Sequence, residues 1–292
     1  MTDRDNKPRN DPGLFAGSNQ SKERYSSNAR PDHTGKKENM NVFPANIGWL
    51  YYKDYYHDIP FHPGQKKEEF KRFFEVKNQA ITTRQLSRYQ EEVKLLELNF
   101  DNVQWFELTT EYPGLVTGLG NPHETHQEGE YKLGFHFDHT TGLPLIPGSS
   151  VKGLLRSAFQ ISPDYIKYIL ENLPGKEPAV LDIDIRQLEK EIFDGERISS
   201  YKRDIFLDAV IVSSGHGEQL FLVDDFITPH PDEFKDPIPF QFLKVLAQVV
   251  FRFQFRLNDG LLSIEDKKNL FNRILLDFGI GAKTNVGYGK FK

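Results

Sequence analysis

The chain has 292 residues, with 42 acidic against 37 basic side chains and a formal net charge of −5 at pH 7. This length allows one large domain or two small ones, each with a sizeable core. The absence of Cys excludes disulfides and thiolate metal sites. The net negative charge argues against a protein that coats nucleic acid non-specifically, so any contact with a polyanion must be confined to local patches.

The sequence shows no sign of a membrane span or of a secretory leader. No run approaches the ~18 uninterrupted apolar residues of a membrane helix, and the N-terminal residues lack an apolar signal core. We therefore expect a cytoplasmic protein without a membrane partner.

Composition divides the chain into three parts. Residues 1–40 hold eight bases, six acids and few large apolar side chains, so they cannot bury enough apolar area to offset chain entropy. We expect a disordered tail there. Residues 41–102 are predicted to form an N-terminal helical extension, and residues 103–292 a single further domain.

Hydrophobic periodicity predicts the elements in chain order. Two helices are expected within 66–100, a strand at 103–110 and a long loop rich in Gly and Pro at 112–148. A helix capped by Ser149 should follow and run to about Ile161. The remaining expected elements are helices at 164–172 and 183–193, a hairpin of strands 204–212 and 219–227, a strand at 243–257, a helix begun by Ser263 and ended by Gly279, and an edge strand at 286–291. This order is typical of an α+β, ferredoxin-like (RRM-like) domain with long inserted loops.

Two basic, glycine-bearing segments carry the strongest functional signal. No Asp or Glu occurs between His139 and Pro163 or after Asp277. The first segment, IPGSSVKGLLRSAFQ, offers a helix N-terminus with free backbone N–H groups, the hydroxyls of Ser149 and Ser150, and two cations one turn apart. Gly153 costs about 1 kcal/mol relative to Ala inside a helix, which suggests that something approaches the backbone there. The alternative is a capped surface helix with two solvated cations.

The second segment, FGIGAKTNVGYGKFK, surrounds Lys283, Thr284 and Asn285 with glycines and is followed by Tyr288. It is not a Walker A loop, because Ala282 stands where that motif requires Gly and the helix precedes the loop. Such a loop can still cradle a phosphodiester through backbone amides. A flexible turn, with Tyr288 packed rather than stacked on a base, is the alternative. We expect the two segments to form one anion-binding surface.

The long loop contains two H-x-x-H pairs, which zinc prefers as ligands. Without Cys, we expect no metal and no other cofactor. Asp138 and His139 suit acid–base cleavage of RNA as an alternative to a positioning role. The four histidines are His123, His126, His136 and His139.

Taken in order, several short motifs resemble the RAMP superfamily of CRISPR-associated proteins, and within it the family of sixth subunits of Cmr (type III-B) effector complexes. These motifs are LVTGLGNP at 115–122, the stretch from Pro144 to Arg156, FLDA at 206–209, TPH at 228–230 and the terminal GIGAKTNVGYGKF. The resemblance covers about residues 103–292.

The resemblance implies a ferredoxin-like RAMP domain in a non-catalytic backbone subunit that caps the complex and contacts guide RNA, target RNA and other Cmr-type subunits. No motif around Asp138 matches the catalytic loop of the cleaving subunits. The RNA-binding residues implied by matching motif are Gly148, Ser149, Ser150, Lys152, Arg156, Gly281, Lys283, Thr284, Asn285, Gly287 and Tyr288. The alternative functions are a metal-independent ribonuclease of the same superfamily that processes CRISPR transcripts, and, more remotely, a nucleotide-binding enzyme.

Overall fold

The computed structural model describes residues 45–60, 66–98, 103–118, 125–173, 183–196, 198–228 and 239–292. The predicted tail at 1–40, His123 and part of the LVTGLGNP and TPH motifs lie outside these residues. Among the described helices, none combines the length and apolar character that a membrane crossing requires.

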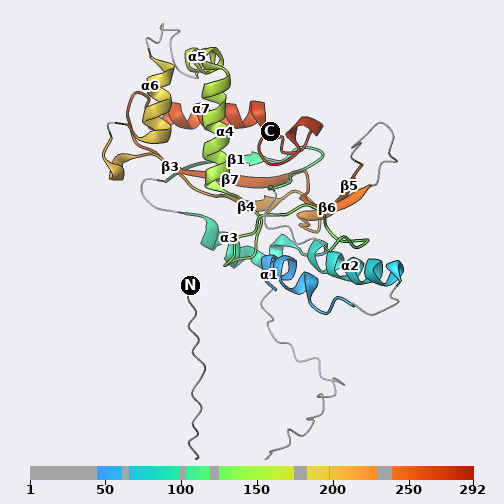
Figure 1. Ribbon diagram of the computed structural model, residues 1–292. Coiled ribbons are helices and arrows are strands. Elements are labelled where there is room, and N and C mark those ends of the chain that lie inside the picture. The colour runs from blue at the N-terminus through green and yellow to red at the C-terminus, as the bar shows by residue number, and fades with distance from the viewer. Residues whose placement is uncertain are drawn as a thin grey trace, which may run out of the picture. The chain divides into compact units, whose positions relative to one another are not determined.

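An antiparallel sheet forms the centre of the fold (Figure 1). Its strands follow the order β1 (Val103–Thr109), β7 (Val249–Arg256), β4 (Ala209–Ser214) and β2 (Leu145–Ile146), and the short β3 (Ile205–Phe206) also pairs with β7. An antiparallel bridge between Thr110 and Phe291 brings the C-terminal residues to the outer edge of β1. A separate two-stranded sheet pairs β5 (Leu222–Ile227) with β6 (Phe240–Val245).

Helices lie on both sides of the central sheet (Figure 1). One group consists of α4 (Gly148–Ile161), α5 (Pro163–Glu171), α6 (Ile185–Glu189) with a π-helical turn at Lys190–Asp194, and α7 (Ile264–Phe278). The other consists of α1 (Ile47–Tyr52), α2 (Lys67–Thr82) and α3 (Gln90–Leu96), with short 3₁₀ turns at Asp54–Tyr56 and Leu86–Tyr89. A last 3₁₀ turn, Thr284–Val286, lies near the C-terminus, and Ser200–Lys202 precedes β3.

The alternation of residues in β7 explains why both faces of the sheet are covered. Phe251, Phe253 and Phe255 are completely buried, and the ring of Phe255 lies 5.5 Å from that of Phe271 on α7. On the opposite face, the Gln254 side chain donates to the Leu96 carbonyl at the end of α3 (3.1 Å). A period of two therefore directs apolar side chains to one helical layer and polar ones to the other.

Most of the predicted elements are confirmed. The helices expected at 66–100, 164–172 and 183–193 are α2 with α3, α5, and α6 with its π-helical turn. Ser263 caps α7 by accepting from the Asp266 N–H, and Gly279 ends that helix. The division of the chain at residue 103 stays a prediction, although side chains from α1 to α3 share one buried cluster with the sheet.

The predicted hairpin of 204–212 with 219–227 is wrong. Strand β4 pairs with β7 on one edge and β2 on the other, so it has no edge left for β5. Strand β5 instead pairs with β6 over six positions. Glycines between two strands indicate a turn, but the choice of partner depends on which edges the rest of the sheet has filled.

The single strand predicted at 243–257 is two strands, β6 and β7, separated by a sharp turn. Gln248 adopts a positive φ of 60° there, and its N–H donates to the Thr110 carbonyl (2.8 Å). The buried Thr110 hydroxyl also donates to the Leu246 carbonyl at 2.7 Å. These tertiary hydrogen bonds interrupt a pattern that is continuous in the sequence.

The edge strand predicted at 286–291 is also wrong, except for its last residues. Val286 and Gly287 belong to turns, and only Phe291 forms a bridge to the edge of β1. The alternating apolar residues of this stretch are separated by glycines with positive φ, which turn the chain instead of extending it.

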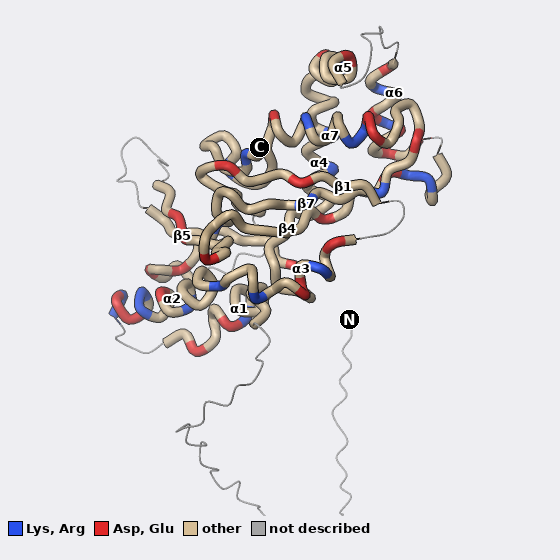
Figure 2. The backbone as a smooth tube through the Cα atoms, turned by 180° about the vertical axis from the view of Figure 1, so that it is seen from behind, with Lys and Arg blue, Asp and Glu red and all other residues tan. Residues whose placement is uncertain are grey.

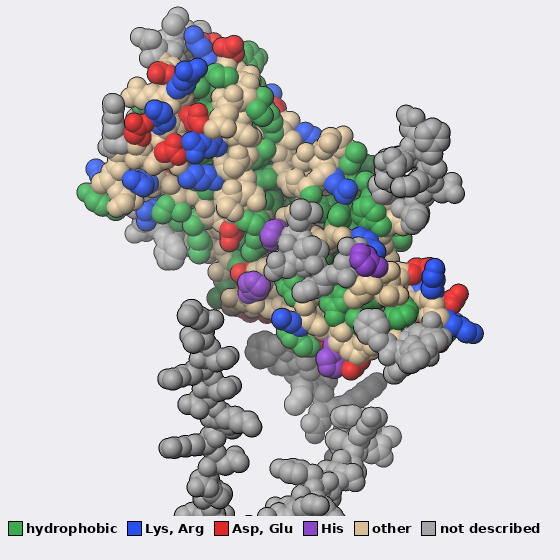
Figure 3. All heavy atoms as spheres, viewed as in Figure 1, with side chains coloured by type: hydrophobic (Ala, Val, Ile, Leu, Met, Phe, Trp, Pro, Cys, Tyr) green, Lys and Arg blue, Asp and Glu red, His purple; other side chains and the backbone are tan. Residues whose placement is uncertain are grey.

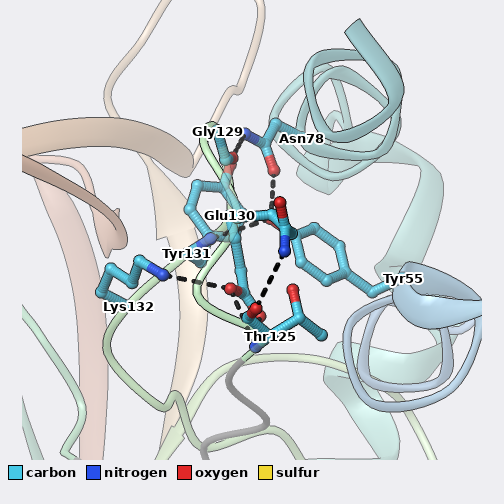
Figure 4. A network of polar contacts seen from close by, with 8 residues as sticks. Tyr55, Asn78, Thr125, Gly129, Glu130, Tyr131 and Lys132 are labelled. Atoms are coloured by element: carbon cyan, nitrogen blue, oxygen red, sulfur yellow. Dashed lines mark hydrogen bonds and ion pairs between the residues drawn. The ribbon is translucent and has the colours of Figure 1, made fainter. Parts of the chain in front are cut away.

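A buried polar network fastens part of the long loop to the N-terminal helices (Figure 4). The Tyr55 hydroxyl donates to Asn78 of α2 (2.7 Å) and accepts from the Tyr131 N–H (3.0 Å), while the Asn78 amide donates to the Gly129 carbonyl (3.0 Å). Glu130, only 1% exposed, accepts from the Thr125 N–H. The helices therefore position the segment that leads to the loop histidines.

A buried ion pair joins α7 to the segment before β3, and it supplies a stability test. Lys267 and Asp204 have side chains only 2% exposed, with 2.7 Å between Nζ and Oδ2. Lys267→Met should lower the free energy of unfolding by about 3–5 kcal/mol, because it leaves a buried carboxylate without its counter-charge. The matched control is Lys268→Met, which removes an ion pair with Glu265. Because the Glu265 side chain is 63% exposed and water can replace the lost partner, this variant should cost at most about 1 kcal/mol. Equal urea midpoints for the two variants would contradict this account.

Candidate nucleic-acid interface

Helix α4 begins one residue earlier than predicted, and a carboxylate already occupies its N-terminus. The Gly148 N–H donates to Asp208 Oδ1 (2.7 Å), whereas the predicted cap, Ser149, lies within the first turn and is exposed. The prediction was wrong because the Pro147 carbonyl already accepts from both Ser150 and Val151. A Cβ at Gly148 would lie 2.3 Å from the Phe206 carbonyl oxygen, so this glycine permits close packing on β3.

The two cations of α4 lie on one flank of the helix. Arg156 is held by acids: its guanidinium donates to both carboxylate oxygens of Asp194 (2.8 and 2.9 Å) and to Glu189 (3.0 Å). These hydrogen bonds raise the pKa of Arg156 further above its ordinary value. The Lys152 ammonium lies 5.9 Å from the centre of the Phe206 ring and forms no ion pair within the described part of the chain. Lys152 is thus the cation of this pair that is available to a ligand.

Ser150 and Leu154 lie on the opposite flank of α4. At 3.6 residues per turn, position 152 is about 200° around the helix from position 150. Gly153 faces outward between the two flanks, is exposed, and has nothing within 4 Å of the position a Cβ would take. No neighbour from the described residues therefore accounts for a glycine at this position.

The C-terminal loop, residues 279–289, is held against the chain that follows β1 by backbone hydrogen bonds, which we call the C-terminal clamp. The Ala282 N–H donates to the Val116 carbonyl (2.9 Å) and the Gly289 N–H to the Gly114 carbonyl (2.8 Å). Within the loop, the Ile280 N–H donates to the Gly289 carbonyl (2.9 Å). Thr109 and Lys292 exchange a further pair of bonds beyond the loop, at 3.0 and 2.9 Å. The loop is therefore a fixed element of the fold.

The polar residues of this loop have different surroundings. Lys283 has a positive φ of 62°, and its ammonium lies 5.5 Å from the centre of the Phe240 ring. Asn285 is exposed and Thr284 half-buried. Tyr288 is only 7% exposed, and its hydroxyl donates to Asp225 (2.6 Å). Burial and this carboxylate raise the pKa of Tyr288, so its ring is a neutral, packed support beneath the loop.

An open groove joins the two segments that the sequence singled out. It lies between α4 and the C-terminal loop, has a volume of about 560 Å³, and we call it the α4–loop groove. Ser150 and Leu154 form one side and Gly279 to Ala282 with Thr284 the other. The remaining lining residues are Thr117, Gly118, His136, Ile146 and Phe278. Of the predicted RNA-binding residues, the structure thus brings together Ser150, Gly281 and Thr284, and it places Lys152 and Arg156 on the other flank of α4.

Charge is distributed unevenly over the face of the molecule that Figure 3 shows. In Figure 3, acidic side chains are interspersed among the basic ones around the upper helices, and the middle of the face is mainly apolar and uncharged. Seen from behind, the tube in Figure 2 likewise alternates between blue and red around α6 and α7 and stays mostly tan along the sheet. The described residues on the face in Figure 3 form no continuous basic stripe, so phosphate contacts on this face must depend on single cations and on backbone amides.

Asp138 and the loop histidines His136 and His139 have different surroundings. Asp138 Oδ1 accepts from the N–H groups of Thr140 and Thr141 and from the Thr141 hydroxyl, so this carboxylate shapes its own turn. His139 is exposed beside Tyr52, with ring centres 6.1 Å apart. In the part of the chain that the structure describes, no three His, Asp or Glu side chains converge as metal ligands.

The sequence did not predict the roles of three residues of this region. Asp208 caps α4, His136 lines the α4–loop groove, and Tyr112 is 88% exposed on the turn next to the C-terminal loop. The FLDA motif was a signal for Asp208, and Tyr-Pro-Gly is a turn signal for Tyr112. No pattern in the sequence indicated that His136 would reach the groove.

Comparison with known proteins identifies the family. The model of the RAMP superfamily matches residues 107–292, almost two thirds of the chain, and the chain therefore belongs to this superfamily.

Two curated relatives are subunits of the same kind. The chain is 26% identical over 231 residues to the CRISPR system Cmr subunit Cmr6 of Pyrococcus furiosus, a match that covers 60% of this chain and 64% of the relative. It is 28% identical over 243 residues to the Cmr6 subunit of Saccharolobus solfataricus, with 78% and 72% covered. The matched region thus spans slightly less than two thirds of the Pyrococcus protein.

Solved structures give more distant matches. A chain from the cryo-EM structure of the type III-B Cmr-beta complex bound to cognate target RNA is 23% identical with a TM-score of 0.49, covering 84% of both chains. The crystal structure of Pyrococcus furiosus Cmr6 is 22% identical with a TM-score of 0.34, covering 65% of this chain and 97% of that one.

Two glycines of the C-terminal loop provide a test of the clamp. A Cβ at Gly289 would lie 2.0 Å from the Ile280 carbonyl oxygen, whereas at Gly287 its nearest neighbour would be Pro113 at 3.6 Å. Both have positive φ, so Gly287→Ala should cost about 1–3 kcal/mol from backbone strain alone. Gly289→Ala should lower the melting temperature clearly more, because the added Cβ also displaces the Ile280 carbonyl. Identical melting curves for the two variants would show that the loop is not packed as described.

Proposed function

We propose that this chain is a guide-RNA-binding, non-catalytic subunit of a cytoplasmic, Cmr-type (type III-B) RNA-guided effector complex directed against invading RNA. The observation that carries the proposal is the α4–loop groove, where the two segments that the sequence predicts to form one anion-binding surface lie side by side. Membership of the RAMP superfamily and the similarity to two Cmr6 subunits support it. Its expected partners are guide RNA, target RNA and other Cmr-type subunits.

We further propose that residues 103–292 form a ferredoxin-like domain. The bridge between Thr110 and Phe291 can be counted as a very short last strand. The sheet order is then Phe291, β1, β7, β4. Numbered along the chain these are strands four, one, three and two of a βαββαβ unit, with α4 and α7 as its helices. The bridge is short because Gly287 and Gly289, at positions that would extend the strand, have positive φ and turn the chain.

The surroundings of each residue suggest its role in RNA binding. We assign direct contact with RNA to six residues that have accessible surface. They are Ser149, Ser150 and Lys152 of α4 and Lys283, Thr284 and Asn285 of the loop. Gly281 and Gly287 provide backbone that RNA can approach. Gly148, Arg156 and Tyr288 act indirectly, because Gly148 and Tyr288 are buried and Arg156 is bound by acids. An RNA strand crossing the outward face of α4 over Gly153 would touch both flanks of the helix.

A ribonuclease is the second candidate function, and the surroundings of the groove argue against it. Metal-independent cleavage of RNA requires a base, an acid and a group that stabilises the charged transition state. His136 is the only titratable side chain among the twelve lining residues. Asp138 uses Oδ1 to hold its own turn, where it accepts from the Thr141 N–H and the Thr141 hydroxyl.

Phosphate contacts should be visible in the salt dependence of RNA binding. Lys152→Gln and Lys283→Gln should each flatten the plot of log affinity against log salt by about 0.7, the value for one lost contact to a single strand. Arg156→Gln should flatten it less, because Asp194 and Glu189 already balance this charge. The measurement is a filter-binding titration at several salt concentrations, with circular dichroism as the folding control. An unchanged slope in the Lys152→Gln/Lys283→Gln double variant would contradict the proposed contacts.

Tyr112 should stack on a base, a role that the sequence left open for Tyr288. Its turn is closed by the Gly114 N–H donating to the Glu111 carbonyl (2.7 Å), so a rigid backbone presents an exposed ring. Tyr112→Ala should weaken single-stranded RNA binding by about 1–3 kcal/mol without changing the salt slope. The matched control is Tyr168→Ala, which removes another exposed tyrosine, on α5. An equal loss of affinity in both variants would refute a specific stacking role.

The non-catalytic assignment predicts that Asp138→Asn and His139→Gln leave target cleavage by a reconstituted complex unchanged. Asn keeps the side-chain oxygen that the turn requires, so folding should be preserved. The wild-type chain alone should also leave repeat-containing RNA intact. Cleavage lost in either variant with guide RNA still bound, or site-specific cutting by the isolated chain, would favour the ribonuclease.

A further inference from the structure

The α4–loop groove carries no charge on its lining. None of the twelve lining residues is Lys, Arg, Asp or Glu. Its walls combine apolar side chains from Ile146, Leu154, Phe278, Ile280 and Ala282 with the hydroxyls of Ser150 and Thr284. A phosphate in this groove would lose its hydration without meeting a counter-charge, which is unfavourable. A neutral ligand with one flat apolar surface and a polar edge fits these walls better.

His136 gives the groove a neutral donor and acceptor. Burial lowers the pKa of His136 below its ordinary value, although the negative charge of Asp208 acts in the opposite direction. The imidazole is therefore uncharged at pH 7, with one nitrogen as a donor and the other as an acceptor. Within the described residues its ring and the hydroxyls of Ser150 and Thr284 have no hydrogen-bond partner. These groups match the edge of a nucleobase or a ribose hydroxyl, each of which both donates and accepts.

The groove has a suitable size and is formed before any ligand binds. Its volume of about 560 Å³ lies within the range of roughly 300–1,000 Å³ that is typical of sites for small organic ligands. The clamp bond from Ala282 to Val116 fixes the loop wall, and a Cβ at Gly281 would lie 2.4 Å from the Val116 carbonyl oxygen. A preformed site avoids most of the entropic cost of ordering a loop on binding.

We infer that the α4–loop groove binds one nucleoside of the RNA, with the base against the apolar wall and the phosphates outside. This inference rests on the proposed function and specifies which part of the RNA enters the groove. Lys283 adjoins two lining residues, Ala282 and Thr284, and supplies positive charge at the edge, where a flanking phosphate would lie. The groove thus recognises an unpaired nucleoside, and the lysines contact the backbone.

Two variants that fill the groove test this inference in the full-length chain. Leu154→Trp fills it from α4 and Ala282→Phe from the loop, and neither changes the charge. Both should weaken binding of an unstructured single-stranded RNA on the order of tenfold, the scale of one lost base contact. The salt slope should stay at the wild-type value, since no phosphate contact is removed. Ile161→Trp is the matched control, because Ile161 is exposed on the same helix and does not line the groove.

A second ligand identifies the part of the RNA that the groove recognises. A tetrahydrofuran-spacer oligomer has the length and charge of the RNA but carries no bases. The difference between wild type and the two groove variants should disappear on this oligomer. If instead the variants lose equal affinity for both oligomers with a flatter salt slope, the groove binds phosphate and the inference is wrong.

The other outcomes separate this inference from the proposed function. Wild-type affinity in both folded groove variants would overturn the nucleoside site and leave RNA binding at α4 and the loop intact. Groove variants that keep RNA but no longer co-purify with neighbouring subunits would also overturn it, in favour of a protein contact. A wild-type chain that binds no RNA would overturn the proposed function, and the nucleoside site with it.

Discussion

The candidate interface depends on the C-terminal clamp. Without the backbone bonds from Ala282 to Val116 and from Gly289 to Gly114, the glycine-rich loop would have no fixed position relative to α4. Glycine is required where the loop approaches the chain after β1 closely: a Cβ at Gly281 would lie 2.4 Å from the Val116 carbonyl oxygen. The same residues that suggest a flexible phosphate-binding loop in the sequence therefore form a rigid wall in the fold.

In the proposed function, this wall separates the part of the interface that offers charge from the part that offers shape. The groove between α4 and the loop is neutral, and the available cations, Lys152 and Lys283, lie outside its lining. A chain with an overall charge of −5 gains little from long-range attraction of RNA. The RNA binding that we propose would then draw its affinity from a few phosphate contacts, from exposed backbone and from the inferred burial of a base. Such binding suits a subunit that would hold RNA together with neighbours in a complex.

The sequence predicted the helices and strands better than it predicted which strands pair and which side chains form hydrogen bonds. Helices α2, α4, α5 and α7 have strong 3.6-residue periodicity, and both glycine-bearing segments were recognised from composition alone. The pairing of β5 with β6 and the turn at Gln248 depend on long-range bonds, such as those of Thr110, that leave no local pattern. Prediction was weakest for side-chain partners, since nothing near Arg156 in the sequence indicates Asp194, and nothing near Gly148 indicates Asp208.

Photo-crosslinking of a 4-thiouridine-substituted RNA to the full-length chain, with the crosslinked residues located by mass spectrometry, tests the central claim most directly. The account predicts crosslinks in three stretches that are distant in sequence: the turn at Tyr112, the first turns of α4 around Ser149 to Gly153, and the C-terminal loop around Lys283 to Asn285. Crosslinks confined to other elements, such as α2 or the outer side of α5, would contradict it.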